Sequence, residues 1–166
     1  MRLTLVFLSM LFFQISFSQK SITTTAYGPL TIKEFDHGLA KVENGKTDTL
    51  SSSPSGTHNW LEDFKIISVT DSIQAQPKAN FGSVYIINAK ESVDIDVVIE
   101  WIYPKEVTNA KGKKFKSFTY GTKRPTNTVT ASSYSLDEPY ELVKGNWQLN
   151  VYIEKQQVLG RTFIVY

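Results

Sequence analysis

The sequence predicts an all-β domain, an immunoglobulin-like antiparallel β-sandwich, and three observations lead to that prediction. Apolar and polar residues alternate along several segments, as they do in strands with one face on a core and the other in water. We find no long segment with the i, i+3, i+4, i+7 apolar spacing of a helix. Gly-Pro, Asn-Gly and Lys-Gly pairs separate the alternating segments at short intervals. A small closed β-barrel is the alternative fold, because it has the same short strands and turns.

The composition is that of one folded domain of ordinary size. The chain has 166 residues, of which 41% are hydrophobic and 20% are charged, and its formal net charge is +2. Such a weak charge does not attract nucleic acid, which we therefore exclude as a partner. The absence of cysteine excludes disulfides, thiolate nucleophiles and cysteine-ligated metal centres. We expect no cofactor, and the sequence leaves the oligomeric state open.

The N-terminus has the pattern of a secretory signal peptide. Arg2 precedes an apolar stretch from Leu3 to Ile15, and Ser16-Phe17-Ser18 then supplies small residues at both positions that a signal peptidase inspects. A membrane anchor is the alternative, but the stretch is shorter than the ~20 residues that span a bilayer, and Gln14 interrupts it. We therefore expect residues 1–18 to be cleaved, leaving a secreted or periplasmic protein with no transmembrane segment.

Residues 19–166 are then expected to form the single β-sandwich domain. Its first predicted strand is Ile22–Tyr27. A flexible loop near residues 45–59 follows, since the run from Ser51 to Thr57 contains only Ser, Pro, Gly and Thr. The next predicted strands are Phe64–Thr70 and Phe81–Asn88.

The clearest alternation lies in Ser92–Trp101 and Asn146–Glu154. Apolar residues occupy every second position on one face of each segment, and those faces include Trp101 and Trp147. We therefore predict that both tryptophans are core residues. Weaker alternation predicts the remaining strands, Phe115–Tyr120, Asn127–Leu136 and Val158–Val165.

The last of these strands contains a conflict of pattern. Val158 and Phe163 are an odd number of residues apart, so a regular strand would place them on opposite faces. Both can face the core only if a bulge lies between them. Gly160 is the expected position, because glycine tolerates the backbone that a bulge needs.

The sequence contains no recognisable catalytic or metal-binding motif. His37 and His58 fall in loop-like sequence, without an acidic or second histidine partner at metal-ligand spacing, and we expect both to be solvated. There is no Gly-x-Ser-x-Gly nucleophile motif and no phosphate-binding glycine loop. We therefore expect a protein without catalytic or metal-ligating residues.

Three acidic residues, Asp94, Asp96 and Glu100, share one face of a predicted strand. They allow a paired-carboxylate or calcium site, because residues two apart on a strand point the same way. The alternative, which we favour, is a wet sheet face that resists edge pairing.

Six basic residues between positions 111 and 124 surround the aromatic residues Phe115, Phe118 and Tyr120. This cluster allows a site for polyanions. The alternative, which we favour, is a hairpin with a charged tip whose aromatic rings point inward.

One motif in the second half of the chain resembles a known family. The segment from Tyr134 to Trp147 reads Tyr-x-Leu-Asp-x-x-Tyr-Glu-Leu-Val-x-Gly-x-Trp. It resembles the signature Gly-Tyr-x-Phe-Asp-x-x-Trp-Glu-Leu-Val-Pro-Gly-x-Trp of an uncharacterised bacterial secreted domain family, one of the families called domains of unknown function. The chain departs from this signature at Ser133, Leu136, Tyr140 and Lys144. The resemblance implies the fold and export, and no activity.

The expected function is that of a non-catalytic secreted or envelope module that binds a protein or a glycan. Acidic and aromatic side chains together suit such partners, since rings stack and carboxylates accept hydrogen bonds. Tyr140 has an alternative role as a tyrosine corner that ties a strand entrance to nearby backbone. A glycan-directed hydrolase or other envelope enzyme is the alternative function, although its acid–base pair is not recognisable. The candidate binding residues are Tyr103, Tyr134, Asp137, Glu138 and Tyr140.

Overall fold

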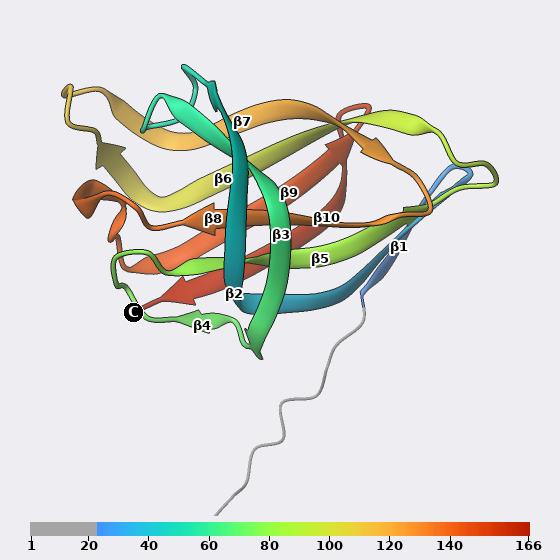
Figure 1. Cartoon of the computed structure of the whole chain (residues 1–166), viewed down its shortest axis with the longest axis horizontal. Helices are drawn as coiled ribbons and strands as arrows, with labels where there is room; N and C mark the ends of the chain where they lie inside the picture. Colours follow the sequence, from blue (N-terminus) through green and yellow to red (C-terminus); the bar gives the residue numbers. More distant parts are fainter. Residues whose placement is uncertain (1–22) are drawn as a thin grey trace, which may run out of the picture.

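Two five-stranded β-sheets pack face to face in the part of the chain that the computed structural model describes, residues 23–166 (Figure 1). The predicted β-sandwich is confirmed, and the closed barrel is wrong. The predicted signal peptide, residues 1–18, lies outside the described residues. Within them, no helix is long and apolar enough to cross a membrane.

The first sheet is antiparallel throughout. Its strands follow the order β1-β2-β5-β8, and β3 pairs with β2 as well. β1 and β8 therefore lie at the two ends of this order. The bounds are Thr24–Tyr27 for β1, Leu30–Thr49 for β2, Thr57–Val69 for β3, Asn80–Asn88 for β5 and Val129–Ser135 for β8.

The second sheet has the order β4-β10-β9-β6-β7. Its strands pair antiparallel, except that β4 and β10 are parallel. A short 3-10 turn, η1 (Pro139–Glu141), connects β8 to β9. The bounds are Ser72–Ile73 for β4, Asp94–Thr108 for β6, Lys114–Pro125 for β7, Gly145–Ile153 for β9 and Gln156–Val165 for β10.

The 20-residue strand β2 is the longest element, and the sequence pattern does not predict it. A bulge at Phe35 shifts the pairing of β2 with β5. The residues that face the core are therefore Ile32 and Glu34 before the bulge, and His37 and Leu39 after it. Two of these four core-side residues are polar, and both are buried. The bulge and the buried polar residues together hide the alternation that marks the other strands.

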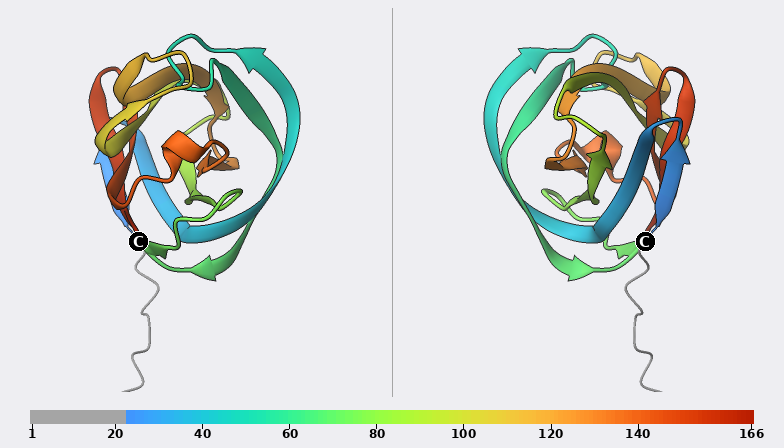
Figure 2. Two further views of the ribbon diagram at one scale, coloured as in Figure 1. Left: turned by 90° about the vertical axis from the view of Figure 1, so that its left-hand side faces the viewer. Right: turned by 90° about the vertical axis from the view of Figure 1, so that its right-hand side faces the viewer.

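Beyond Ala40, β2 leaves the sandwich and forms a long hairpin with β3, which we call the strap (residues 41–65). Figure 1 shows it crossing in front of β5 and β8, and Figure 2 shows it arching away from the body of the molecule. Its tip is held to the second sheet, because Ser52 Oγ donates to the Thr119 carbonyl (2.9 Å) and Asn109 Nδ2 donates to the Pro54 carbonyl (2.9 Å).

The predicted loop near residues 45–59 is shorter in the structure. Residues 45–49 belong to β2 and residues 57–59 belong to β3, so only residues 50–56 connect the strands. Thr47, Asp48 and Thr49 pair with the start of β3. These strand ends are polar because much of their surface faces water, which made them resemble a loop in the sequence.

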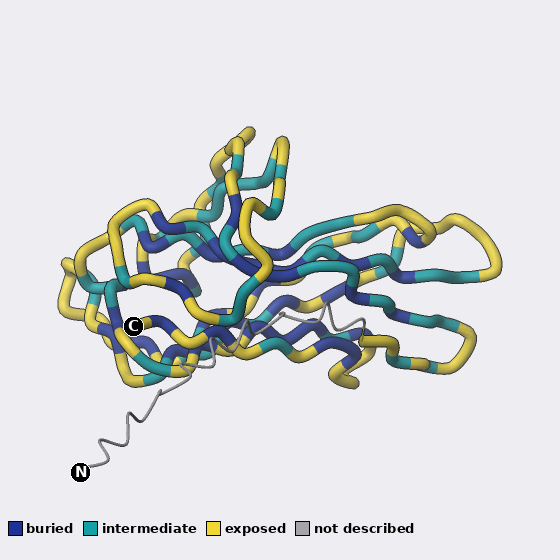
Figure 3. The backbone as a smooth tube through the Cα atoms, turned by 90° about the horizontal axis from the view of Figure 1, so that it is seen from below, coloured by how far each residue is buried: buried dark blue, intermediate teal, exposed yellow. Residues whose placement is uncertain are grey.

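The core between the sheets is rich in aromatic rings. Trp101 and Trp147 are completely buried, as predicted, and each meets the ring of Phe81 edge to face, at centroid distances of 5.6 and 5.9 Å. Figure 3 shows the buried positions along the middle of the strands, with exposed residues at the turns.

The bulge predicted in the last strand exists, but at Val158 instead of Gly160. Gln157 pairs with Tyr152 and Leu159 pairs with Val151, so Val158 is the extra residue. Val158 and Phe163 are both buried. A Cβ at Gly160 would lie 2.4 Å from Gln157 Nε2, the end of a flexible side chain that can move aside.

Candidate functional site

A groove lies between the strap and β8. One half is a cavity of about 340 Å³, lined by residues 58–64 of β3 and by β8 from Val129 to Ser133. The other half, of about 280 Å³, continues toward Lys78 and Glu138. The two halves share His58, Asn59, Leu61 and Ser133, so we treat them as one site and call it the strap groove.

An aromatic cluster from the strap and β7 forms one wall of the groove. His58 and Trp60 are two apart on β3, and their rings meet edge to face at 4.6 Å. The ring of Tyr120 lies 4.3 Å from His58. Trp60 Nε1 donates to Asp48 Oδ2 (2.6 Å), which holds the indole in place. The strap thus presents two half-buried, ordered rings to the groove, those of His58 and Trp60.

The charges around His58 favour its neutral form. Burial lowers the pKa of His58, the positive charge of Arg124 lowers it further, and Asp48 acts in the opposite direction. Arg124 is held in the groove because its Nη2 donates to the Ala131 carbonyl (3.2 Å). At neutral pH, His58 therefore presents an uncharged ring to the groove.

The prediction that both histidines are solvated loop residues is wrong. His58 lies on β3 within the aromatic cluster, and His37 lies on β2, where only 7% of its surface is exposed. Both residues stand in polar sequence that gives no strand signal. Only the pairing of β2 with β3 and β5 shows their position.

Two of the predicted binding residues, Tyr103 and Tyr134, are buried, so their rings are not exposed for a partner to stack on. Their hydroxyl oxygens lie 3.2 Å apart, and Tyr134 also donates to Glu141 Oε1 (2.7 Å). Burial raises the pKa of both tyrosines. Tyr134 is among the residues that line the groove, and its ring packs on Trp147.

Glu141 organises the turn that carries the other predicted residues. Its Oε2 accepts hydrogen bonds from the backbone N–H groups of Asp137 and Glu138, at 3.0 and 2.9 Å. Burial raises the pKa of Glu141, although these bonds and the bond from Tyr134 oppose the shift. Tyr134 and Glu141 therefore hold the turn before β9. Tyr140, the residue predicted as a tyrosine corner, lies beside a neighbouring cavity instead.

Asp137 and Glu138 lie on the rim of the groove, so the structure brings them together with Tyr134. Asp137 pairs with Lys78 (3.0 Å). Tyr140 lies beside a neighbouring cavity together with Glu138, and burial, with the nearby Glu141 and Glu138, raises the pKa of Tyr140 to about 12. Tyr103 does not line the groove.

The acidic face of β6 is engaged in local pairs. Asp96 pairs with Lys123 (3.2 Å), and Glu100 accepts hydrogen bonds from Asn150 (3.1 Å) and Tyr152 (2.8 Å). Among residues 23–166, no group of three acidic or histidine side chains is placed to hold a metal ion. These contacts fit a stabilised sheet face.

The basic segment 111–124 is likewise engaged with its own surroundings. Lys114 pairs with Glu106 (2.9 Å), and the Lys113 ammonium lies 4.8 Å from the ring centroid of Phe115. The three aromatic side chains are buried: Phe115, Phe118 and Tyr120. This arrangement matches the hairpin interpretation, with rings inward and charges at the surface.

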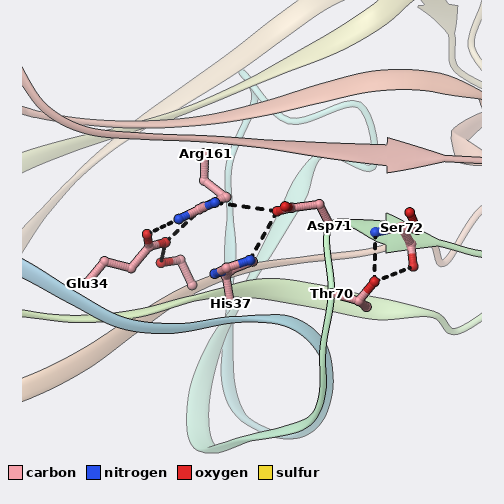
Figure 4. A network of polar contacts seen from close by, with 7 residues as sticks. Glu34, His37, Thr70, Asp71, Ser72 and Arg161 are labelled. Atoms are coloured by element: carbon pink, nitrogen blue, oxygen red, sulfur yellow. Dashed lines mark hydrogen bonds and ion pairs between the residues drawn. The ribbon is translucent and has the colours of Figure 1, made fainter. Parts of the chain in front are cut away.

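A buried ion network lies apart from the groove, and the sequence analysis missed it (Figure 4). The Arg161 guanidinium on β10 forms two hydrogen bonds to Glu34 on β2, and its Nη1 lies 3.5 Å from Asp71 Oδ1. His37 Nε2 lies 3.2 Å from the same Asp71 oxygen, and Ser83 Oγ donates to Glu34 Oε1 (2.6 Å). Burial lowers the pKa of Arg161, but the bonds to Glu34 outweigh it and raise the pKa overall. The network joins the two sheets.

The family described as Domain of unknown function (DUF3859) matches residues 30–165. The chain belongs to this family. The matched range runs from the start of β2 to the end of β10 and contains the whole strap groove. No curated protein matches the chain.

Among solved structures, this member of the DUF3859 family is similar to an immunoglobulin-like protein from Pseudomonas aeruginosa. The two chains are 20% identical, the TM-score is 0.58, and the match covers 90% of this chain and 100% of the other. At this identity the likeness concerns the fold alone, which is an immunoglobulin-like β-sandwich.

Proposed function

We propose that the protein is a non-catalytic, exported module that binds a protein or glycan partner in the strap groove. The groove itself is the observation that carries this proposal. It combines half-buried rings, charged rim residues and open backbone in one concave surface, which is the usual composition of a binding site. The strap extends beyond the sandwich, and its tip packs against the core through Leu50.

A binding role fits the two buried carboxylates better than catalysis does. Glu34 is held by Arg161 and Ser83, and Glu141 is held by Tyr134 and two backbone N–H groups. Each carboxylate accepts three hydrogen bonds from protein donors, and groups held in this way serve structure more readily than proton transfer.

Export is supported by the basic residue, apolar stretch and small residues before position 19. We expect the native protein to begin at Gln19. Intact mass and N-terminal sequencing of the protein from its own cells decide this point, and a full-length species in the membrane fraction would contradict it.

The binding proposal is tested with the processed protein immobilised as bait for envelope extract and for a glycan array. Trp60→Ala removes the central ring of the groove. Ile67→Ala is the matched control, because Ile67 is exposed on the same strand outside the groove. We expect the partner to bind the wild type and the Ile67 variant and to be lost with Trp60→Ala. Equal capture by all three proteins would show that the site lies elsewhere.

A further inference from the structure

β8 has an open backbone edge. It pairs with β5 on one side, and among residues 23–166 no strand pairs with its other side. Open edges are normally protected, because their unpaired N–H and C=O groups accept a further strand. Here the strap arches over the region, so the edge is shielded from large surfaces and remains accessible through the groove.

The register shows which backbone groups face the groove. The Leu136 N–H donates to the Ala79 carbonyl (2.9 Å), and hydrogen-bonded pairs recur at every second residue of an antiparallel ladder. Tyr134 and its alternate neighbours therefore bond to β5, while Ala131 and Ser133 direct their backbone groups outward. The bond from Arg124 to the Ala131 carbonyl agrees with this alternation, because it shows that this carbonyl points away from β5.

The groove carries a surplus of negative charge. Its two halves are lined by five carboxylate residues and two basic residues, and one of the basic residues, Lys78, is already paired with Asp137. The carboxylates are Glu62, Asp63, Asp137, Glu138 and Glu141. A positively charged ligand therefore fits this surface best, by charge complementarity.

We propose that the strap groove takes an extended, positively charged peptide segment that adds as a strand to the open edge of β8. This inference rests on the proposed binding function and names its ligand. Strand addition supplies main-chain hydrogen bonds for affinity, and alternate side chains give specificity. One set of side chains would meet His58 and Trp60 beneath the strap, while basic side chains reach the acidic rim.

The length of the edge sets the size of the ligand. β8 has seven residues, which span roughly 24 Å at about 3.4 Å per residue. A segment of about seven residues therefore covers it. A folded domain would need to present a terminus or a long exposed loop.

The first experiment selects random peptides of about ten residues by display on the processed protein and measures the synthesised winners by calorimetry. We expect selected peptides to be rich in Lys or Arg and in β-branched residues. Two versions of each peptide carry N-methyl groups at every second residue, one at the odd and one at the even positions. One version should bind about tenfold or more weakly and the other nearly as well as the unmodified peptide, since only one set of N–H groups faces β8.

The second experiment alters the protein. Ala131→Pro removes the outward N–H of β8 without removing a bond to β5, and we expect it to weaken peptide binding by about tenfold. Ala131→Ser keeps the N–H and should bind as the wild type does. The melting temperatures of both variants are measured, and the methylated peptides report on the wild-type protein if the proline variant does not fold.

The outcomes separate this inference from the proposed function. A glycan or envelope partner that depends on Trp60, with no peptide selected, would overturn the peptide inference and leave the proposed function in place. Peptides that bind equally in both methylated versions would also overturn strand addition, as would dimerisation through β8 in place of peptide binding. If no ligand depends on Trp60, both proposals fail.

Discussion

The aromatic core and the strap are built from similar rings but are held in different ways. In the core, Trp101 and Trp147 are fully buried and touch only protein. In the strap, Trp60 is half-buried, and polar bonds at the tip attach the hairpin to the second sheet. The core rings are closed off from solvent, whereas the strap rings of His58 and Trp60 keep part of their surface exposed.

This difference indicates that substitutions in the strap can change function while the fold is kept, whereas substitutions in the core cannot. Removing a completely buried ring leaves a cavity between two sheets that cannot close over it. Removing a strap ring exposes surface that already meets water. Substitutions in the two regions should therefore separate stability from binding.

The largest effect is expected for Trp147→Ala. It should lower the free energy of unfolding by roughly 3–5 kcal/mol, the range for deleting a buried large aromatic side chain. Denaturant titration measures it. A change within about 0.5 kcal/mol, typical of surface sites, would break the distinction between core and strap.

The next effect is expected in the ion network that joins the sheets. Arg161→Met leaves the buried Glu34 without its cation and should cost about 3 kcal/mol, because an unpaired buried carboxylate is unfavourable. The double variant Arg161→Met with Glu34→Met should recover much of this loss. Equal destabilisation of the single and double variants would show that the pair itself supplies the stability.

A smaller change in stability is expected for Trp60→Ala, about 1 kcal/mol, since the ring is only half-buried. Thermal unfolding beside the Trp147 variant makes the comparison direct. A loss as large as that of Trp147→Ala would mean that the strap is part of the folding core, and would weaken its assignment as a binding element.

The smallest effect concerns His58. Its pKa is lowered, so the folded protein prefers the neutral ring, and this contribution to stability is present above the ordinary pKa of 6.5 and declines as the pH falls through the folded value. Arg124→Gln should raise the pKa of His58, and Asp48→Asn should lower it. NMR titration of the imidazole measures both pKa values. An unchanged pKa in both variants, or a fall with Arg124→Gln and a rise with Asp48→Asn, would place His58 outside this charge cluster.

Much of the fold could be predicted from the sequence, because most strands keep one apolar face. Ser92–Trp101 and Asn146–Glu154 alternate cleanly, and they became parts of β6 and β9. β2 could not be predicted in the same way. A bulge at Phe35 changes its phase, and the core side carries Glu34 and His37, whose burial depends on Arg161 and Asp71 from distant parts of the chain.

The candidate site was predictable only at its rim. Asp137 and Glu138 were chosen for their acidic character, and they do lie on the groove. Trp60 was not chosen, since the groove exists only once β3 has paired with β2 and arched over β8. The burial of Tyr134 also escaped the sequence, because its motif resembled an exposed turn while its ring faces Trp147.

The ion pair between Glu34 and Arg161 has a consequence for how the chain folds. It joins residues 127 positions apart, as does the hydrogen bond from Tyr27 to Glu154. Such contacts give the domain a high contact order, and we expect it to fold on a timescale of about milliseconds to seconds, as comparable all-β domains do. This ion pair cannot form until β10 has left the ribosome. Slow folding of this kind suits a chain proposed to cross a membrane before its structure forms.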